Sequence, residues 1–437
     1  MKERIVVLGV LAVMLCSCKF TNRSVVDFTE GQNYDPSMFY VVAQRDRDLS
    51  KEMPEDCYLP GGVTIEEYTE QGEMSPQTSS TSMTAVIQAL FGWSGNAQVV
   101  ELSGIYQSVE NIDASEEKPV MLSGKVIMPA NGKFKRYMLV SHYTIGSNAE
   151  APSNCFSLEG IFAQMGYCVI IPDYLGYGIT ADRIHPYLMM NATAWHVLSM
   201  FYAVRNYMES RDIRPEYEDI FMLGYSQGGA TTMAVQHIIE EYADELEDHQ
   251  GYGEIKIRRN FAGGGPYDVK ATYDNFVETG NASYPIAVPL VIQGMLAGDT
   301  SLKVDINTLL QPRIAENLDE WINSKRYTSA VINKLIGTKK TDKILSEKGM
   351  DRSNAEVSEL YKALSLNSII NQHWTPKAPV YMLHSIDDET VPFDANASRA
   401  KSKWGDNNIQ YNFGYYGGHV NTCLRFLYTV KGILENE

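Results

Sequence analysis

A serine in a glycine-rich turn gives the first indication of chemistry in this chain. Residues 221–235 read FMLGYSQGGATTMAV, and their central GYSQG matches the pattern G-x-S-x-G. Such a turn joins a strand to a helix and presents a serine hydroxyl, here that of Ser226, as a nucleophile. Glycines are needed at Gly224 and Gly228 because a Cβ there would collide with the neighbouring strand or helix. The alternative is that Ser226 is only a small residue in the turn.

The flanking sequence favours a nucleophile. Five-residue motifs occur by chance, so we require a strand before the serine and a helix after it. Ile220 to Leu223 is a short apolar run typical of a buried parallel strand, and Ala230 to Glu241 has a helical pattern. A serine hydroxyl is a poor nucleophile near neutral pH. Ser226 therefore needs a base, and an acid that orients the base.

Chain order indicates which histidine is the base. After a turn of this kind the acid and then the histidine follow the serine in sequence. The histidines beyond Ser226 are His237, His249, His373, His384 and His419. His419 lies in the glycine loop YYGGHVNT, after the last predicted strand and before a predicted helix. A loop at the carboxyl end of a strand can approach the serine turn, so we predict His419 as the base.

The acid is predicted from the segment LHSIDDETVPF, which offers Asp387, Asp388 and Glu389 after a strand. The segment resembles the H-G-x-x-D-x-x-V-P sequence of many α/β-hydrolases, with Ser385 where glycine is usual. That resemblance selects Asp388. Asp387 is the competing choice, and its other role would be to cap the backbone of the turn. Adjacent side chains leave a turn in different directions, so only one of the two can meet His419.

Acyl transfer also needs fixed hydrogen-bond donors for the negative charge on the former carbonyl oxygen. The backbone N–H of Gln227, directly after the serine, is one predicted donor. The second should come from the loop VSHYTIGSN after the third predicted strand. This loop resembles the H-G-x oxyanion loop of the same superfamily, with Tyr143 replacing the glycine. The donor is then Tyr143 or Thr144, and we choose Thr144; His142 either shapes this loop or is a structural turn histidine.

The elements that must position these residues alternate between strand and helix. The predicted strands before residue 267 are Val99–Val109, Val120–Met128, Tyr137–Ser141, Cys168–Ile171, Ile220–Leu223 and Ile255–Phe261, the first two resembling a hairpin. Helical patterns cover Ser157 to Met165, ended by Gly166, and Leu188 to Met208. This alternation predicts an α/β fold with a mostly parallel central sheet and helices on both faces.

The alternation stops between residues 267 and 376. This stretch contains helical patterns such as Pro312 to Ser324 and Ala355 to Ala363. Strands resume at Val380 to Leu383 and Ile409 to Phe413, before a last helix from Val420 to Leu434. We predict a helical cap, inserted after the sixth strand, over the carboxyl ends of the strands, where such folds bind ligands. The alternative is a helical subdomain without a role in the site.

Composition bounds the possible partners. A chain of 437 residues with 44% hydrophobic content can bury a large core. The predicted division is 1–18 as a lipoprotein-type signal peptide, 19–96 as an N-terminal extension, 97–266 as the first part of the core, 267–376 as the cap and 377–437 as the second part of the core. A net charge of -17 argues against nucleic acid as a partner. Neither a C-x-x-C motif nor a histidine-rich cluster suggests a metal, and we expect no cofactor.

The amino terminus predicts export. Lys2 and Arg4 precede an apolar run from Ile5 to Leu15 that is too short to span a bilayer, as in a signal peptide. Residues 15–18, LCSC, resemble the lipobox of bacterial lipoproteins, which predicts lipid attachment at Cys18. The expected location is then the bacterial cell envelope, facing the periplasm or on the outer membrane, with membrane contact only through this anchor. The alternative is an ordinary secretory signal with incidental cysteines.

Four cysteines follow the predicted signal peptide: Cys57, Cys155, Cys168 and Cys423. They allow three pairings, among which the sequence does not choose. Cys168 lies inside an apolar run and is expected to be a buried thiol.

Two further segments carry a family resemblance. IIPDYLGYG at residues 170–178 and HPYL at 185–188, followed by a long helix and GYSQGG, are similar to the secretory lipase group and related bacterial esterases of the α/β-hydrolase superfamily. The resemblance covers about residues 97–266 and 377–434. It implies hydrolysis of a small-molecule carboxylic ester through an acyl-enzyme, without a cofactor.

The same resemblance leaves other functions open. Asp173 is expected to be an exposed carboxylate that supports its loop. A serine exopeptidase of the prolyl type on the same fold is one alternative function, because this superfamily hydrolyses several kinds of bond. A non-catalytic surface lipoprotein that binds a glycan or a lipid is the other.

Overall fold

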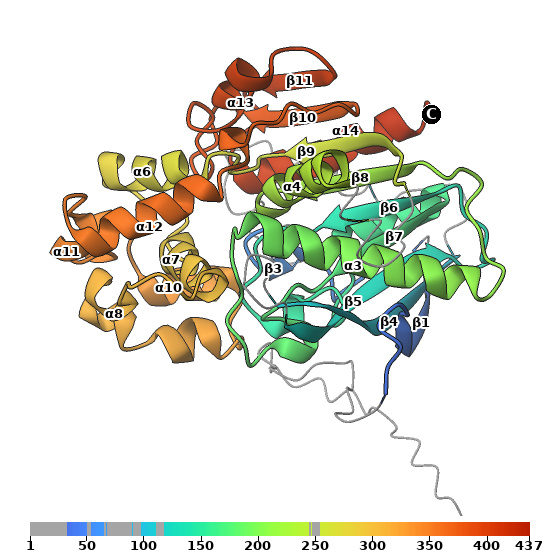
Figure 1. Cartoon of the computed structure of the whole chain (residues 1–437), viewed down its shortest axis with the longest axis horizontal. Coiled ribbons are helices and arrows are strands. Elements are labelled where there is room, and N and C mark those ends of the chain that lie inside the picture. Colours follow the sequence, from blue (N-terminus) through green and yellow to red (C-terminus); the bar gives the residue numbers. More distant parts are fainter. Residues whose placement is uncertain are drawn as a thin grey trace, which may run out of the picture.

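The computed structural model describes residues 33–49, 54–64, 67, 90, 98–110, 118–243, 246 and 254–437. Within them, nine strands form one sheet in the order β1-β4-β5-β7-β6-β8-β9-β10-β11 (Figure 1). Their bounds are β1 Tyr40–Asp48, β4 Gln98–Val109, β5 Pro119–Pro129, β6 Arg136–Ser141, β7 Tyr167–Pro172, β8 Ile220–Tyr225, β9 Ile257–Gly263, β10 Val380–Ser385 and β11 Ile409–Gly414. A separate small hairpin pairs β2 (Tyr58–Leu59) with β3 (Val63–Thr64).

The sheet is antiparallel at one edge and parallel over the rest. The pairs β1–β4, β4–β5 and β5–β7 are antiparallel. From β7 through β6, β8, β9 and β10 to β11, every pair is parallel. The central strand β8, IFMLGY, is buried along its whole length, as expected for a parallel strand covered on both faces. The prediction of a mostly parallel sheet is confirmed.

Helices cover both faces of this sheet. α3 (Met190–Glu209), α4 (Gln227–Glu241) and α13 (Ala397–Trp404) pack on one face, and η2 (Leu158–Met165) and α14 (His419–Leu434) on the other. Successive strand residues point to opposite faces, so Met222 joins the core beneath α3 and α4, whereas Leu223 joins the core beneath α14. Because the strands from β7 to β11 run parallel, their carboxyl ends lie at the same edge of the sheet, and the loops that follow them can converge there.

The region between β9 and β10, the cap, is helical and has its own core. Its elements are α6 Val269–Thr279, α7 Ala287–Gly298, α8 Ile306–Leu309, α9 Pro312–Ala315, the π-helical turn η4 Asp319–Asn323, α10 Ser329–Ile336, η5 Thr341–Lys343, α11 Glu347–Met350, α12 Ala355–Leu366 and η6 Ile369–Asn371. Ile292, Leu310 and Leu360 belong to the apolar cluster at its centre. Figure 1 shows the cap helices, in yellow and orange, gathered beside one end of the sheet.

Two predicted elements differ in the structure. The helix expected over Pro312 to Ser324 is broken into α9 and η4, where Asn317 donates its side-chain amide to the Arg313 carbonyl at 2.8 Å. The Asn317 backbone N–H donates to the Ile314 carbonyl at 3.1 Å, so the α-helical hydrogen bond from Asn317 to Arg313 is replaced. The helix expected from Ser157 is the 3₁₀ helix η2, which ends as predicted at Gly166, with φ 88°.

Sequence analysis missed the three described strands of the N-terminal extension, of which only β1 joins the large sheet. β1 pairs antiparallel with β4 at the sheet edge, so the cap follows the seventh strand of this sheet along the chain rather than the sixth. Four of the nine residues of β1, YVVAQRDRD, are charged, and the strand is only partly buried. Edge strands are often charged because this protects them from pairing with other chains, and the apolar signal is then weak.

The predicted signal peptide and Cys18 lie outside the described residues. Among the helices that the structure describes, none is both long enough and apolar enough to cross a membrane.

Candidate active site

Ser226 lies at the turn where β8 ends and α4 begins. Its backbone has φ 58° and ψ -124°, a left-handed conformation that is uncommon for a residue with a side chain. The Ser226 N–H donates to the Gly263 carbonyl of β9 at 2.9 Å, which fixes the turn against the sheet. Strain of this kind is retained where the surroundings hold it, and it displays the hydroxyl above the strand ends.

The two flanking glycines are required by close backbone contacts. A Cβ on Gly224 would lie 2.0 Å from the Gly228 carbonyl oxygen, and a Cβ on Gly228 would lie 1.9 Å from the Ser141 carbonyl oxygen. Any side chain at either position would force the turn away from β6 or from its own first helical turn.

The structure brings Ser226, His419 and Asp388 into one hydrogen-bonded chain. His419 begins α14, and its Nε2 lies 2.8 Å from the Ser226 Oγ. Its Nδ1 lies 2.6 Å from the Asp388 Oδ2. The other carboxylate oxygen of Asp388 accepts the backbone N–H groups of Thr390 and Val391 at 2.8 and 2.9 Å. The aspartate is thus fixed in place, and its orientation fixes the imidazole.

The charge of Asp388 determines the tautomer of His419. Burial, the largest single influence, raises the pKa of the Asp388 carboxyl. The adjacent His419 ring, the His384 ring and the Val391 N–H together lower it by more, so that the pKa lies below its ordinary value of 3.8. An ionised carboxylate only accepts hydrogen bonds, so Nδ1 carries the proton. Nε2 then offers its lone pair to the Ser226 hydroxyl, the arrangement that a general base needs.

Asp387 has a different role from its neighbour. It accepts hydrogen bonds from the Ser385 hydroxyl and from the Gly417 N–H, the latter at 3.2 Å. The Ser385 hydroxyl in turn accepts the Tyr416 N–H at 2.8 Å. The serine that replaces the usual glycine therefore ties the end of β10 to the loop that delivers His419.

None of the other described histidines considered as bases is hydrogen-bonded to Ser226, although the His384 Nε2 lies 3.9 Å from the Asp388 Oδ2. His237 lies in α4 and packs against Trp374, and His373 is exposed at the end of the cap. His384 is fully buried, with Nε2 2.8 Å from the Val391 carbonyl oxygen. His249 lies outside the described residues.

Gln227 and Thr144, the predicted oxyanion donors, follow the adjacent strands β8 and β6. Gln227 is the first residue of α4, and Thr144 follows β6. Among the described residues, neither backbone N–H has a hydrogen-bond acceptor, which leaves both available to a substrate. Tyr143, the alternative donor, is anchored by its phenol to the Tyr58 carbonyl. His142 stacks on Tyr174, and burial lowers its pKa to about 4.

Sequence analysis missed two buried residues beside these donors. His185 Nε2 lies 2.8 Å from the side-chain amide nitrogen of Gln227, and the Tyr187 hydroxyl lies 2.8 Å from the Thr144 Oγ1. Both belong to the HPYL segment, which carries a family resemblance but no predicted site residue. The only sign of these contacts in the sequence is that the polar His185 and Tyr187 lie among apolar residues, in IHPYLMM at 184–190.

Asp173 was expected to be exposed, and this is wrong. It is fully buried, accepts the Ser123 hydroxyl and takes the Ser153 N–H at 2.8 Å. It supports its loop from inside, where burial raises its pKa above the ordinary value. Cys57, Cys155, Cys168 and Cys423 are all buried free thiols. No group of three or more potential metal ligands occurs in the described part of the chain.

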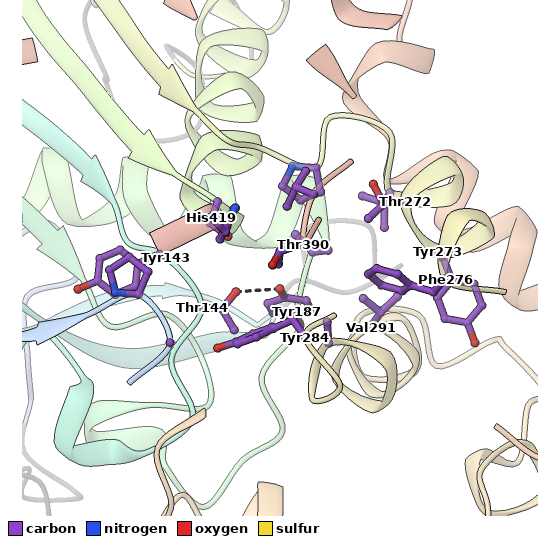
Figure 2. A pocket seen from close by; sticks show the side chains of 18 of the residues that line it. Tyr143, Thr144, Tyr187, Thr272, Tyr273, Phe276, Tyr284, Val291, Thr390 and His419 are labelled. Carbon is purple, nitrogen blue, oxygen red and sulfur yellow. Dashed lines mark hydrogen bonds between the residues drawn. The ribbon is translucent and has the colours of Figure 1, made fainter. Parts of the chain in front are cut away.

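A cavity beside Ser226 is shared between the core and the cap. Core residues that line it include Thr144, Tyr187, Leu188, Ser226, Val391, His419 and Val420, and cap residues include Val269, Tyr273, Phe276, Tyr284, Ala287 and Val291. Figure 2 shows Tyr273, Phe276 and Val291 on the side opposite His419. The α6 and α7 helices thus form one wall of the site, which argues against a cap without a role.

The secretory lipase family matches the chain over residues 154–425, a range that includes the serine turn, the cap and His419. The chain belongs to the secretory lipase family.

One relative of this chain is a fungal lipase of low sequence identity. A secreted triacylglycerol lipase of Malassezia furfur is 25% identical over 320 residues, which cover 70% of this chain and 58% of that protein. This chain therefore spans less than two thirds of the relative's length.

Two solved structures are similar in fold. The rice cell wall degrading esterase LipA of Xanthomonas oryzae aligns with a TM-score of 0.63 and 19% identity. The alignment covers 80% of this chain and 92% of the esterase chain. Candida antarctica lipase A aligns with a TM-score of 0.53 and 19% identity, over 76% and 74% of the two chains. At these identities the likeness establishes the α/β-hydrolase fold.

Proposed function

We propose that this protein is an exported serine hydrolase that cleaves carboxylic esters through an acyl-enzyme. The observation that carries the proposal is the hydrogen-bonded chain from the Ser226 Oγ to the His419 Nε2, and from the His419 Nδ1 to Asp388, at 2.8 and 2.6 Å. This is the geometry that turns a serine hydroxyl into a nucleophile.

Each residue then has a defined step. The Ser226 Oγ attacks the acyl carbon while the His419 Nε2 removes its proton, and Asp388 stabilises the imidazolium. As the carbon–oxygen bond breaks, His419 gives the proton to the leaving alcohol. A water molecule attacks the acyl-enzyme with His419 again as base, and the proton returns to the Ser226 oxygen as the acid leaves. The N–H groups of Gln227 and Thr144 hold the oxyanion in both halves.

The cavity supports an acyl chain as part of the substrate. Its lining residues are mainly apolar and aromatic, and none of them is Asp, Glu, Lys or Arg. Recognition of a peptide terminus usually needs a charged group, so the lining favours an ester over a prolyl peptide. The Malassezia furfur relative is named a triacylglycerol lipase, which is consistent with fatty acyl esters as the substrate class.

Export and anchoring rest on the amino terminus and on a relative. The charged and apolar run of residues 1–15 resembles a signal peptide, and the Malassezia furfur lipase is named as secreted. We propose that Cys18 carries a lipid, which would hold the enzyme at a bacterial envelope membrane. Metabolic labelling with a fatty acid analogue, in the intact chain and in Cys18→Ala, tests the anchor directly.

Labelling with a fluorophosphonate probe tests the hydrolase. Purified protein without residues 1–18 is treated with the probe, mapped by peptide mass and assayed on p-nitrophenyl esters and on prolyl amides. We expect label on Ser226 alone, turnover of esters, and neither label nor turnover in Ser226→Ala. Turnover of prolyl amides in preference to esters would favour the exopeptidase, and a folded protein that takes no label would favour the binding lipoprotein.

A further inference from the structure

One short segment contacts both predicted oxyanion residues. Residues 185–188 lead into α3 and contribute two buried side chains, His185 and Tyr187, which are 2% and 5% exposed. His185 contacts Gln227, and Tyr187 contacts Thr144. The two donor loops come from different strands, β6 and β8, and this segment is a single piece of chain that touches both.

The hydrogen bonding of His185 defines its tautomer. Its Nδ1 lies 2.8 Å from the Leu175 carbonyl oxygen, which can only accept, so Nδ1 carries the proton. Nε2 is then an acceptor, and the side-chain amide of Gln227 donates to it at 2.8 Å. Burial lowers the pKa of His185 well below its ordinary value, which is consistent with a neutral ring. The side chain of Gln227 is therefore held in one position, and with it the start of α4.

The Thr144 and Tyr187 hydroxyls form a hydrogen-bonded pair in which one of the two O–H groups is not used. Their oxygens are 2.8 Å apart, and only one O–H can donate across that distance (Figure 2). Within the described residues, neither hydroxyl has another partner. Both residues line the cavity that contains Ser226. The remaining O–H can therefore donate to a substrate atom there.

The cap packs closely against residues 185–188 through α7. Gly294 of α7 packs so closely that a Cβ there would lie 2.2 Å from the Tyr187 carbonyl oxygen. On the core side, the Tyr177 hydroxyl donates to the carbonyl of Ile145, directly after Thr144, at 2.6 Å. These contacts hold Tyr187 and the Thr144 loop in fixed relation.

We propose that His185 and Tyr187 position the oxyanion hole from its two sides, and that the Thr144–Tyr187 hydroxyl pair supplies a third donor to the oxyanion. The inference rests on the proposed ester hydrolysis at Ser226. His185 acts through Gln227 and is a positioning residue. The hydroxyl pair contacts the reacting oxygen only as negative charge develops on it, so its contribution belongs to the transition state.

Tyr187→Phe tests the hydroxyl pair. Steady-state kinetics on a p-nitrophenyl ester are compared with inhibition by a trifluoromethyl ketone, which forms a tetrahedral oxyanion on the serine. We expect kcat to fall on the order of 100-fold with KM changed less than about twofold, and the inhibition constant to rise in parallel with the loss of kcat. Thr144→Val should have a similar effect, and the double variant should be little worse than either, because the two hydroxyls act as a unit.

Tyr137→Phe is the matched control. Tyr137 lies on β6, the strand that leads to Thr144, and its buried hydroxyl has no partner among the described residues. It should keep wild-type kcat and inhibitor affinity, which separates loss of the pair from loss of any buried hydroxyl. Wild-type kcat in a folded Tyr187→Phe, or a rise in KM alone, would overturn the third donor.

His185→Gln and His185→Leu test the positioning role. Gln keeps an acceptor that can meet the Gln227 amide, whereas Leu removes it, so we expect kcat to fall in Leu and to recover largely in Gln. Equal kcat in both variants would overturn the role. Fluorophosphonate labelling of wild-type Ser226 reports on the proposed function independently: an active, labelled wild type with unaffected variants would refute only this inference.

Discussion

Asp387 and Asp388 are neighbours in the chain, yet their carboxylates hold different parts of the same loop. Asp388 Oδ2 lies 2.6 Å from the His419 Nδ1, and Asp387 Oδ1 accepts the Gly417 N–H at 3.2 Å. One residue therefore orients the imidazole, and the other fixes the backbone that brings it to Ser226. This division leads to a direct comparison.

Replacing each aspartate with asparagine should give very different losses. Asp388→Asn offers a side-chain N–H to His419 and favours the wrong tautomer, so we expect kcat to fall on the order of 10⁴-fold. Asp387→Asn leaves the imidazole partner intact, and we expect a loss of about 10-fold or less. The measurement is kcat and KM of both variants on one p-nitrophenyl ester. A larger loss in Asp387→Asn would transfer the acid role to that residue.

A pair of substitutions at Ser226 separates chemistry from backbone strain. Ser226→Ala and Ser226→Gly both remove the hydroxyl, and both should lose on the order of 10⁶-fold in kcat. They differ in conformation, because φ 58° is strained for alanine and allowed for glycine. Strain of this kind costs about 1–3 kcal/mol, so Ser226→Gly should unfold at a higher temperature than Ser226→Ala. Equal melting temperatures would show that the turn is relaxed around the serine.

The order of the chain was sufficient to predict which residues meet. Ser226, Asp388 and His419 follow the carboxyl ends of β8, β10 and β11, and parallel strands bring those ends to one edge. Covalent order and strand alternation are both readable from sequence.

Contacts between side chains distant in sequence could not be read in the same way. Tyr187 meets Thr144 and His185 meets Gln227 across more than forty residues, and such pairs leave no periodic pattern. The edge strand β1 was missed for a related reason: an edge position tolerates charge, so its sequence shows little of the apolar alternation that identifies a strand.

Glu150 makes the stability of the fold depend on pH. Its Oε2 accepts hydrogen bonds from the Gly146 and Ser147 N–H groups at 3.0 and 2.8 Å, but burial raises its pKa from the ordinary value of 4.5 to about 7. A raised pKa means that the folded state favours the protonated carboxyl. The stabilisation is complete below about pH 4.5 and is lost as pH rises through 7.

Glu150→Gln should remove the contribution of this group; Glu159, whose pKa burial also raises to about 7, keeps its own contribution in both proteins. The amide keeps one oxygen for the Gly146 and Ser147 donors and does not titrate. The free energy of unfolding of the variant should therefore change less than that of the wild type between pH 4.5 and 8. The wild type should lose up to about 3 kcal/mol over that range through this group. Denaturant titrations at several pH values measure the difference between the two proteins. Parallel stability curves would exclude Glu150 as the source.

The last prediction concerns how the cap wall limits the acyl chain. Val291 of α7 and Phe276 of α6 line the cavity beside Ser226, so Val291→Phe should fill part of it. Each buried methylene contributes about 0.8 kcal/mol, or roughly fourfold in kcat/KM, which makes long chains lose most. We expect hydrolysis of p-nitrophenyl octanoate to fall at least about 10-fold, while hydrolysis of the acetate stays within about twofold. Val277→Phe is the control, because Val277 adjoins Phe276 on α6 and packs in the cap core outside the cavity. Equal losses on both esters in Val291→Phe would mean that the acyl chain does not lie between α6 and α7. A selective loss on the octanoate, absent from Val277→Phe, would identify these helices as the acyl-binding wall.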